Sequence, residues 1–258
     1  MDNTQNETSA SEEQQYKTAD TSLFTVGGVL GITWRTLFNN PVVFFGLSII
    51  TIILGTLAEF ILLTTIPDIR KETFEFCQQI INIVLGQWIG GAIAYGVYQT
   101  FMGRRALLGA SLFYGLKRFV HLIFIGILCG IGVVLGTMLF VVPGLILMCM
   151  CYVSAPVCVV ERLGAVDSIT RSAQLTKGYR MKIFGLILVF IIIIFVATRI
   201  WFKLFLGTST GQIINFILLQ VIVLIPFALA NIMPSVIYFE LRRVKEGVAV
   251  DSLANVFD

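Results

Sequence analysis

The sequence predicts an all-α polytopic membrane protein. We expect six transmembrane helices, paired as three hairpins, with amphipathic interfacial helices on the cytoplasmic side. The 258 residues are 57% hydrophobic and their mean hydropathy is +0.91. Only 13% are charged, against roughly 25% in an average soluble domain. Several apolar runs exceed the ~18 residues that mark a membrane-spanning helix.

The chain opens with a polar segment, residues 1–22, which carries five carboxylates against Lys17. This composition predicts a disordered cytoplasmic tail. It lacks a basic stretch followed by an apolar core, so we expect no cleaved signal peptide. Residues 23–258 are expected to form one membrane domain. It begins with an amphipathic segment, Phe24 to Asn39, in which Trp34 suits a membrane interface.

Six apolar runs follow in order, and each is long enough or apolar enough to be a span. Asn40 and Pro41 predict a helix N-cap followed by proline in the first turn. Val142-Pro143-Gly144 predicts a tight turn between the third and fourth spans. The predicted spans are residues 41–66, 77–101, 119–142, 145–160, 181–205 and 212–239.

A short amphipathic helix is predicted after the fourth span, from about residue 165 to residue 177. Its apolar stripe, at i, i+3, i+7 and i+10, consists of Val166, Ile169, Ala173 and Thr176. Asp167 in the first turn suits the helix dipole, and Gly178 suits the position after the helix end. The basic polar side favours a cytoplasmic membrane interface. The alternative is a connecting helix that packs only on its own protein.

The basic residues predict the orientation. Most of the 18 Lys and Arg residues fall on one set of loops and ends, whereas Arg70, Lys71, Arg199 and Lys203 fall on the other. The positive-inside rule therefore places both termini in the cytoplasm, and six spans agree with that parity.

The exits from successive hairpins look alike. The segments 164–169 and 247–253 share a glycine, small residues, Asp-Ser and an aliphatic residue. This similarity predicts three repeat units, each a helical hairpin with a cytoplasmic interfacial helix. The alternative is that every hairpin that returns to a basic cytoplasmic face looks like this.

Two of these exits resemble a known family. The matching segments are Pro156–Ile169, Arg171-Ser172, Leu175–Gly178, Val236–Arg242 and Lys245–Gly247. They are similar to the membrane-spanning domain joined to some bacterial glycerophosphodiester phosphodiesterases, and to related stand-alone bacterial membrane proteins. The resemblance implies a bacterial plasma (inner) membrane location and a link to phospholipid metabolism. The phosphodiesterase activity of the fused proteins belongs to a separate barrel domain, and nothing in this chain corresponds to it.

Polar residues inside the predicted spans are one set of candidate functional residues. Glu59 is a functional candidate, as intramembrane ionisable groups are, or else it pairs with Arg199 or reaches water. Amides in spans either hydrogen-bond between helices or line a solute path. The candidates of this set are Glu59, Gln87, Arg199, Gln220 and Asn231.

Basic residues at the cytoplasmic exits are the other set. Each basic residue near an anionic leaflet contributes about 1 kcal/mol of attraction. These residues are therefore expected either to bind lipid headgroups or only to set the topology. The headgroup candidates are Arg104, Arg105, Arg162, Arg171, Arg180, Arg242 and Arg243.

No catalytic constellation is visible in the sequence. His121 is the only histidine, and the five cysteines form no CxxC pair. We therefore expect no catalytic residues, no metal, no cofactor and no nucleic acid partner. The expected function is non-enzymatic: lipid contact or scaffolding in envelope lipid processes, with anionic lipids of the cytoplasmic leaflet and a protein partner or second copy as partners. The alternative is a small-solute transporter or channel lined by Glu59, Gln87, Gln220 and Asn231.

Overall fold

The computed structural model describes residues 24–66, 70–205 and 212–247, with side chains described outside 201–223. These residues form helices and no strands, and six of the helical segments are long and apolar enough to cross a membrane. The predicted all-α polytopic membrane class is therefore confirmed. The predicted tail at 1–22 and the last amphipathic segment, after residue 247, lie outside the described residues.

The helices of the six spans follow the predicted bounds closely, although several are longer and the fourth span consists of two helices, α7 and α8. Their bounds are α3 (Pro41–Thr65), α4 (Lys71–Phe101), α6 (Phe119–Leu139), α7 (Val141–Cys151), α8 (Ser154–Val160), α10 (Arg180–Phe205) and α11 (Gln212–Glu246). Three short helices lie outside the spans: α2 (Val26–Asn39), α5 (Leu108–Lys117) and α9 (Ala165–Thr176). Each short helix precedes one helical hairpin, so the order of elements repeats three times.

The start of α3 differs from the prediction in one detail. Pro41 is in the first turn, as expected, but the Asn40 side chain does not cap the helix. Its Nδ2 instead donates a hydrogen bond to Thr100 Oγ1, 3.0 Å away at the end of α4. Because proline has no N–H, the first turn leaves one donor fewer to cap, and the amide ties the two ends of the hairpin together.

The turn between α6 and α7 is also displaced. It was predicted at Val142-Pro143-Gly144, but the chain turns at Phe140, whose backbone is extended. Pro143 and Gly144 lie inside the first turns of α7. Proline is tolerated there because the first N–H groups of a helix have no intrahelical acceptor.

The fourth span was predicted as one helix, and the structure breaks it into α7 and α8. Pro156 lacks the N–H that would bond the carbonyl of Tyr152, so the helix is interrupted just before it. Backbone carbonyls at the break are satisfied by hydroxyl groups. Ser154 Oγ donates to the carbonyl of Cys151 at 2.6 Å, and Ser172 Oγ of α9 donates to the carbonyl of Met150. The second bond joins α9 to the broken span.

Of the apolar stripe predicted for α9, only Thr176 is buried against the protein. Val166, the first residue of the predicted stripe, is 65% exposed, and Ile169 and Ala173 are half-buried. The buried residues of α9 are Ser168, Ser172, Leu175 and Thr176. Ser168 and Thr176 donate to carbonyls of their own helix, which satisfies the hydroxyls and lets small side chains pack closely. The predicted end is confirmed, since Gly178 has a positive φ of 90°.

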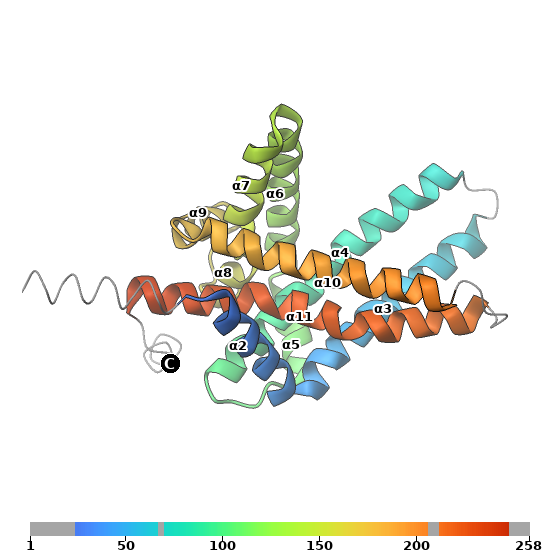
Figure 1. Cartoon of the computed structure of the whole chain (residues 1–258), viewed down its shortest axis with the longest axis horizontal. Helices are drawn as coiled ribbons and strands as arrows, with labels where there is room; N and C mark the ends of the chain where they lie inside the picture. The colour runs from blue at the N-terminus through green and yellow to red at the C-terminus, as the bar shows by residue number, and fades with distance from the viewer. Residues whose placement is uncertain (1–23, 67–69, 206–211, 248–258) are drawn as a thin grey trace, which may run out of the picture.

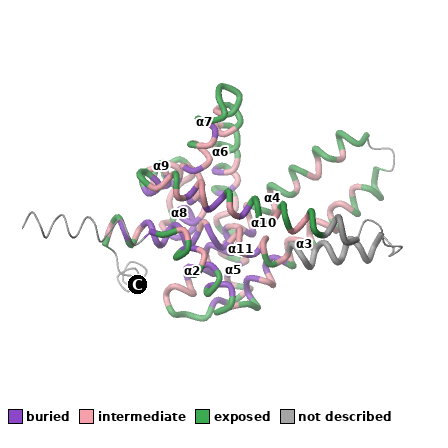
Figure 2. Tube along the Cα trace, in the orientation of Figure 1, coloured by how far each residue is buried: buried purple, intermediate pink, exposed green. Residues whose placement is uncertain are grey.

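The three hairpins diverge from a common base (Figure 1). The α6–α7 hairpin leaves in one direction, and α3–α4 and α10–α11 leave in others. The base consists of α8, the adjoining parts of α4 and α11, and the short helices, and it holds the largest hydrophobic core cluster. Buried residues gather there, whereas the described hairpin tips are mostly exposed (Figure 2). In a membrane, the apolar side chains of these outer segments face lipid.

A close helix–helix approach joins α5 to α4 in the base. A Cβ atom added at Gly115 would lie 2.9 Å from the backbone nitrogen of Ala92 and 2.9 Å from the carbonyl oxygen of Trp88. Trp88 Nε1 donates to the carbonyl of Leu112 at 3.3 Å across the same contact. Both contacts are with backbone atoms of α4, which cannot move aside as the end of a flexible side chain could. This position therefore requires glycine.

We predict that Gly115→Ala destabilises the protein by about 1–3 kcal/mol, the usual cost of overpacking. Thermal unfolding in detergent, followed by circular dichroism at 222 nm, measures it. Gly109→Ala is the matched control, because it lies in the same helix with nothing within 4 Å of an added Cβ. Equal melting temperatures for the two variants would contradict the close approach.

Candidate anion-binding site

A network of ionised groups connects the exit of α8 to the end of α11. Arg171 of α9 lies between two carboxylates: its Nε is 3.2 Å from Glu161 Oε2, and its Nη2 pairs with Glu246 Oε1. Glu161 begins the loop after α8 and Arg171 lies in the middle of α9, whereas Glu246 is 75 residues farther along the chain than Arg171. The network therefore joins segments that are distant in sequence.

Arg242 and Tyr238 close the network into a ring. Arg242 Nε donates to Glu246 Oε2 at 2.9 Å, and its Nη1 donates to the Tyr238 hydroxyl at 2.9 Å. That hydroxyl donates in turn to Glu161 Oε1 at 3.0 Å. Two arginines balance two glutamates, so the ring is electrically neutral.

The ring lies partly inside the base. The exposed fractions of the Arg171, Glu161, Arg242 and Glu246 side chains are 28%, 17%, 15% and 23%. Burial would lower the pKa of the Arg171 guanidinium, but the hydrogen bond that it donates to Glu246 and the charges of both glutamates outweigh burial and raise that pKa. Arg171 therefore remains a cation with both carboxylates as partners.

Lys245 adds a second link between α11 and α9. Its Nζ donates to the carbonyls of Gln174 and Lys177, each 2.7 Å away. A cation at the C-terminal end of a helix satisfies carbonyls that have no intrahelical donor and suits the helix dipole. The end of α11 therefore contributes residues to the ring and also binds the C-terminal end of α9.

The loop after α8 turns sharply at Arg162. Its φ of 56° is the one positive φ of a non-glycine residue within the described ranges. This left-handed backbone costs of order 1–3 kcal/mol. The turn separates two neighbouring charges, because Glu161 faces the ring whereas Arg162 lines a cavity on another side.

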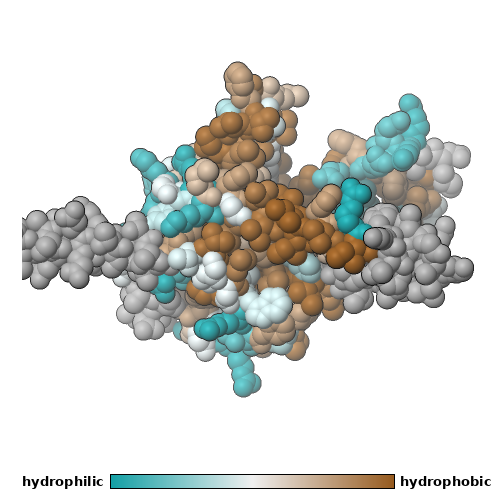
Figure 3. Space-filling view, in the orientation of Figure 1, coloured by the Kyte–Doolittle hydropathy of each residue, from teal (hydrophilic) through white to brown (hydrophobic). Residues whose placement is uncertain are grey.

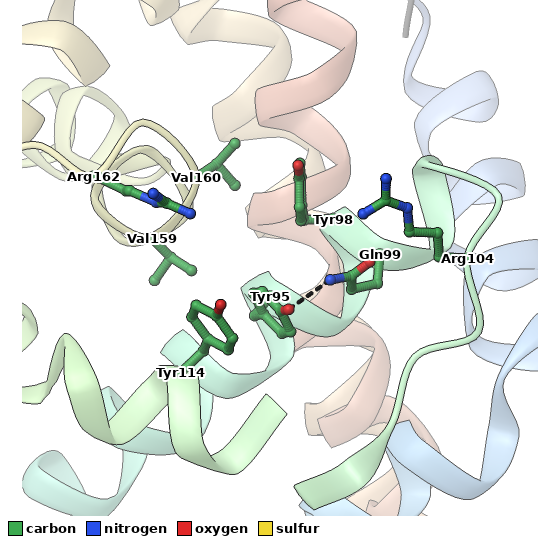
Figure 4. A pocket seen from close by; sticks show the side chains of 8 residues that line it. All are labelled: Tyr95, Tyr98, Gln99, Arg104, Tyr114, Val159, Val160 and Arg162. Carbon is green, nitrogen blue, oxygen red and sulfur yellow. Dashed lines mark hydrogen bonds between the residues drawn. The ribbon is translucent and has the colours of Figure 1, made fainter. Parts of the chain in front are cut away.

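This cavity has a volume of about 140 Å³. Figure 4 shows the guanidinium groups of Arg104 and Arg162 directed inward from opposite sides. Arg104 comes from the loop after α4, and Arg162 from the loop after α8. The remaining lining residues are Tyr95, Tyr98 and Gln99 of α4, Tyr114 of α5, and Val159 and Val160 of α8.

The polar groups between the two arginines form a connected set. Gln99 Nε2 donates to the Tyr95 hydroxyl at 2.6 Å (Figure 4). The Tyr95 and Tyr114 rings stack with their centroids 4.0 Å apart and their planes at 9°. The described lining therefore contains two guanidinium groups, three phenols and one amide, and no carboxylate. Such a lining suits an anion.

The structure sorts the predicted headgroup candidates into groups. Arg104 and Arg162 share the cavity, and Arg171 and Arg242 belong to the ring. Arg243 Nη2 pairs with Glu240 Oε2 at 2.9 Å. Arg105 is exposed and does not line the cavity, and Arg180 lines a different cavity, against α7.

Sequence reasoning missed the carboxylates of the ring and the tyrosines of the cavity. The spacing of Tyr95, Tyr98 and Gln99, at i, i+3 and i+4, was a usable signal, because it places three polar side chains on one face at the end of an apolar helix. No comparable signal links Glu161 to Glu246.

The intramembrane candidates do not gather at this cavity. Gln87 packs against Gly126 of α6, where an added Cβ would lie 2.8 Å from its Nε2. Asn231 Nδ2 donates to the carbonyl of Phe227 in its own helix at 2.8 Å. The Gln220 side chain lies outside the described residues.

Glu59 and Arg199 are not paired. No ion pair joins them in the part of the chain whose side chains are described, and the Arg199 guanidinium lies over the Phe195 ring, 4.8 Å from its centroid. Glu59 is half-buried on α3. Likewise, no group of three or more metal-ligating side chains is found in the described ranges.

Comparisons with known proteins return no match to a family model, to a curated protein or to a solved structure. The resemblance to the membrane domain of bacterial glycerophosphodiester phosphodiesterases therefore stays a prediction.

A double-mutant cycle tests the ring. We predict a favourable coupling of about 1 kcal/mol or more between Glu161 and Arg171, measured with E161Q, R171Q and the double variant in chemical unfolding. Each single change removes one of the partners of a partly buried charge: E161Q leaves Arg171 with Glu246, and R171Q leaves Glu161 with Tyr238 and Arg242.

The exposed pair Lys71–Glu75, with side chains 86% and 65% exposed, is the control. Its coupling should be about 0.5 kcal/mol or less. A coupling between Glu161 and Arg171 no larger than this control value would show that the ring does not stabilise the base.

Proposed function

We propose that this integral membrane protein binds the phosphate headgroup of anionic phospholipids at its base, and that it acts in envelope lipid processes as a lipid-contacting or scaffolding protein. The observation that carries the proposal is the cavity in which Arg104 and Arg162 converge beside three tyrosines. The six apolar helical segments supply the membrane setting.

The chemistry of the cavity suits a phosphate group. Arginine presents planar donors that match phosphate oxygens, and such charge-assisted hydrogen bonds are the strong ones. Tyr114 and Tyr98 contribute hydroxyls from two different helices. Val159 and Val160 of α8 add an apolar wall, and Arg104 and Arg162 are themselves exposed, so a phosphate from outside the protein can reach them.

The position of the cavity suits a lipid rather than a soluble anion. It lies beside the ends of membrane-spanning helices, where the headgroups of a bilayer lie. We propose that the base faces the cytoplasm of a bacterial cell, that both termini lie there and that the membrane is the plasma membrane. An anionic cytoplasmic leaflet then attracts the basic residues of the base.

We further propose that the protein is not an enzyme. The groups that line the cavity are binding groups: guanidinium, phenol and amide. In this proposal, the scaffolding role also involves binding to a protein partner or to a second copy of the chain.

The experiment is native mass spectrometry of the protein released from nanodiscs that hold equal phosphatidylglycerol and phosphatidylcholine. The unmodified protein should retain phosphatidylglycerol selectively. Loss of a charged hydrogen bond costs roughly 1.5–3 kcal/mol, so Arg104→Gln with Arg162→Gln should weaken that retention by at least about tenfold.

The matched control is Arg105→Gln with Arg35→Gln. It removes the same charge from exposed positions that do not line the cavity. If the control lost as much phosphatidylglycerol as the cavity variant, general surface charge, and not this cavity, would explain the retention.

The orientation has its own test. A fluorescent protein that folds only in the cytoplasm, fused after residue 258, should fluoresce, and alkaline phosphatase at the same place should stay inactive. A reporter inserted at residues 67–69, between α3 and α4, should give the opposite pattern. Active phosphatase at the C-terminus would refute the proposed topology.

A further inference from the structure

A second cavity lies between α7 and α10 and has a volume of about 180 Å³. One wall is a single face of α7: Val142, Leu145, Ile146 and Cys149 recur at i, i+3, i+4 and i+7. The other wall is the start of α10, with Arg180, Met181 and Phe184. Apart from Arg180, every lining residue is apolar.

The cavity exists because the α6–α7 hairpin and α10 leave the base in different directions (Figure 1). Apolar side chains lie over both α7 and α10 on the face shown in Figure 3. Met181 is 81% exposed and Ile146 is 42% exposed, so the cavity opens to the surroundings. In a membrane, those surroundings are acyl chains.

Arg180 is the one charged group in this apolar groove. Its Nε is buried and has no hydrogen-bond partner among the described residues. Nor does any carboxylate in the described ranges form an ion pair with its guanidinium. A buried donor of a charged group that lacks an acceptor is unfavourable. The position therefore calls for an acceptor from outside the chain, and an anionic one fits best.

The polar and apolar parts of the groove are arranged as in an amphiphile. Arg180 is the first residue of α10 and lies at the base, near the end of α7 that holds Cys149. From there the apolar wall runs along α7 toward Val142, away from the base. A cation at one end and a hydrocarbon wall beyond it match a phospholipid, with its phosphate and its acyl chain.

We propose that the groove between α7 and α10 is a second phospholipid site. The phosphate accepts hydrogen bonds from Arg180, and an acyl chain lies against the α7 face around Ile146. This site is separate from the cavity of Arg104 and Arg162 and does not depend on it.

The test places a photoreactive benzoylphenylalanine at Ile146 in the full chain, in nanodiscs of equal phosphatidylglycerol and phosphatidylcholine with identical acyl chains. Intact mass after irradiation counts the adducts of each lipid. The same residue at Ile127, which is 49% exposed on α6 and outside the groove, reports ordinary boundary lipid.

We expect phosphatidylglycerol adducts to exceed phosphatidylcholine adducts at Ile146 but not at Ile127. Arg180→Gln should reduce that excess by about tenfold, as loss of a charged hydrogen bond implies. Arg180→Lys, which keeps the charge, should retain part of it. The Arg104→Gln, Arg162→Gln variant should leave it unchanged, which separates the two sites.

Equal adducts of both lipids at Ile146 would overturn the proposal, as would an excess that survives Arg180→Gln. Far-ultraviolet circular dichroism and gel filtration of each variant show whether it is folded. If Arg180→Gln does not fold, the protein with benzoylphenylalanine at Ile146 and no other change decides the question. A phosphatidylglycerol excess at Ile146 that is no larger than the excess at Ile127 then refutes the site.

Discussion

The neutral ring of Glu161, Arg171, Arg242 and Glu246, closed by Tyr238, is the interaction on which the base depends. Inside a membrane, helices gain little from burying apolar surface against one another, because lipid is equally apolar. Polar contacts and close packing must therefore hold the helices together. The ring provides such polar contacts between the loop after α8, α9 and the last turns of α11.

The same constraint explains other features of the base. Each hydroxyl or carbonyl at membrane depth needs a partner within the protein. Ser172 supplies one to the carbonyl of Met150 at the break before α8, and Gly115 lets α5 reach the backbone of α4. The break also frees the chain to turn at Arg162. That turn directs one charge into the ring and the next into the cavity.

Hydropathy predicted the helical class and six spans, because long apolar runs have few alternatives in a membrane. It could not place the helix ends. α11 continues to Glu246 because its last turns are stabilised by the Arg242–Glu246 pair, and no hydropathy signal reports that. The buried face of α9 was missed because Ser168 and Ser172 look polar in sequence, yet their hydroxyls bond to carbonyls.

The candidate site was predicted in part. Arg104 and Arg162 were named as headgroup residues from their position at basic exits, and the structure brings them to one cavity. Arg171 and Arg242 were named on the same grounds, but they pair with carboxylates. Arg242 pairs with Glu246 at i,i+4, which was a usable local signal, whereas the contacts of Arg171 with Glu246 and of Tyr238 with Glu161 join residues 75 and 77 positions apart, which a single sequence does not reveal.

The position of Glu246 also has a consequence for biosynthesis. The ring joins Arg171 to Glu246, a residue near the end of α11 that is synthesised 75 residues later. Until α11 has been synthesised and inserted, Glu161 and Arg171 have only each other, and Tyr238 and Arg242 do not yet exist. The three hairpins must therefore enter the membrane before the base can close, so its assembly is a late event that follows insertion.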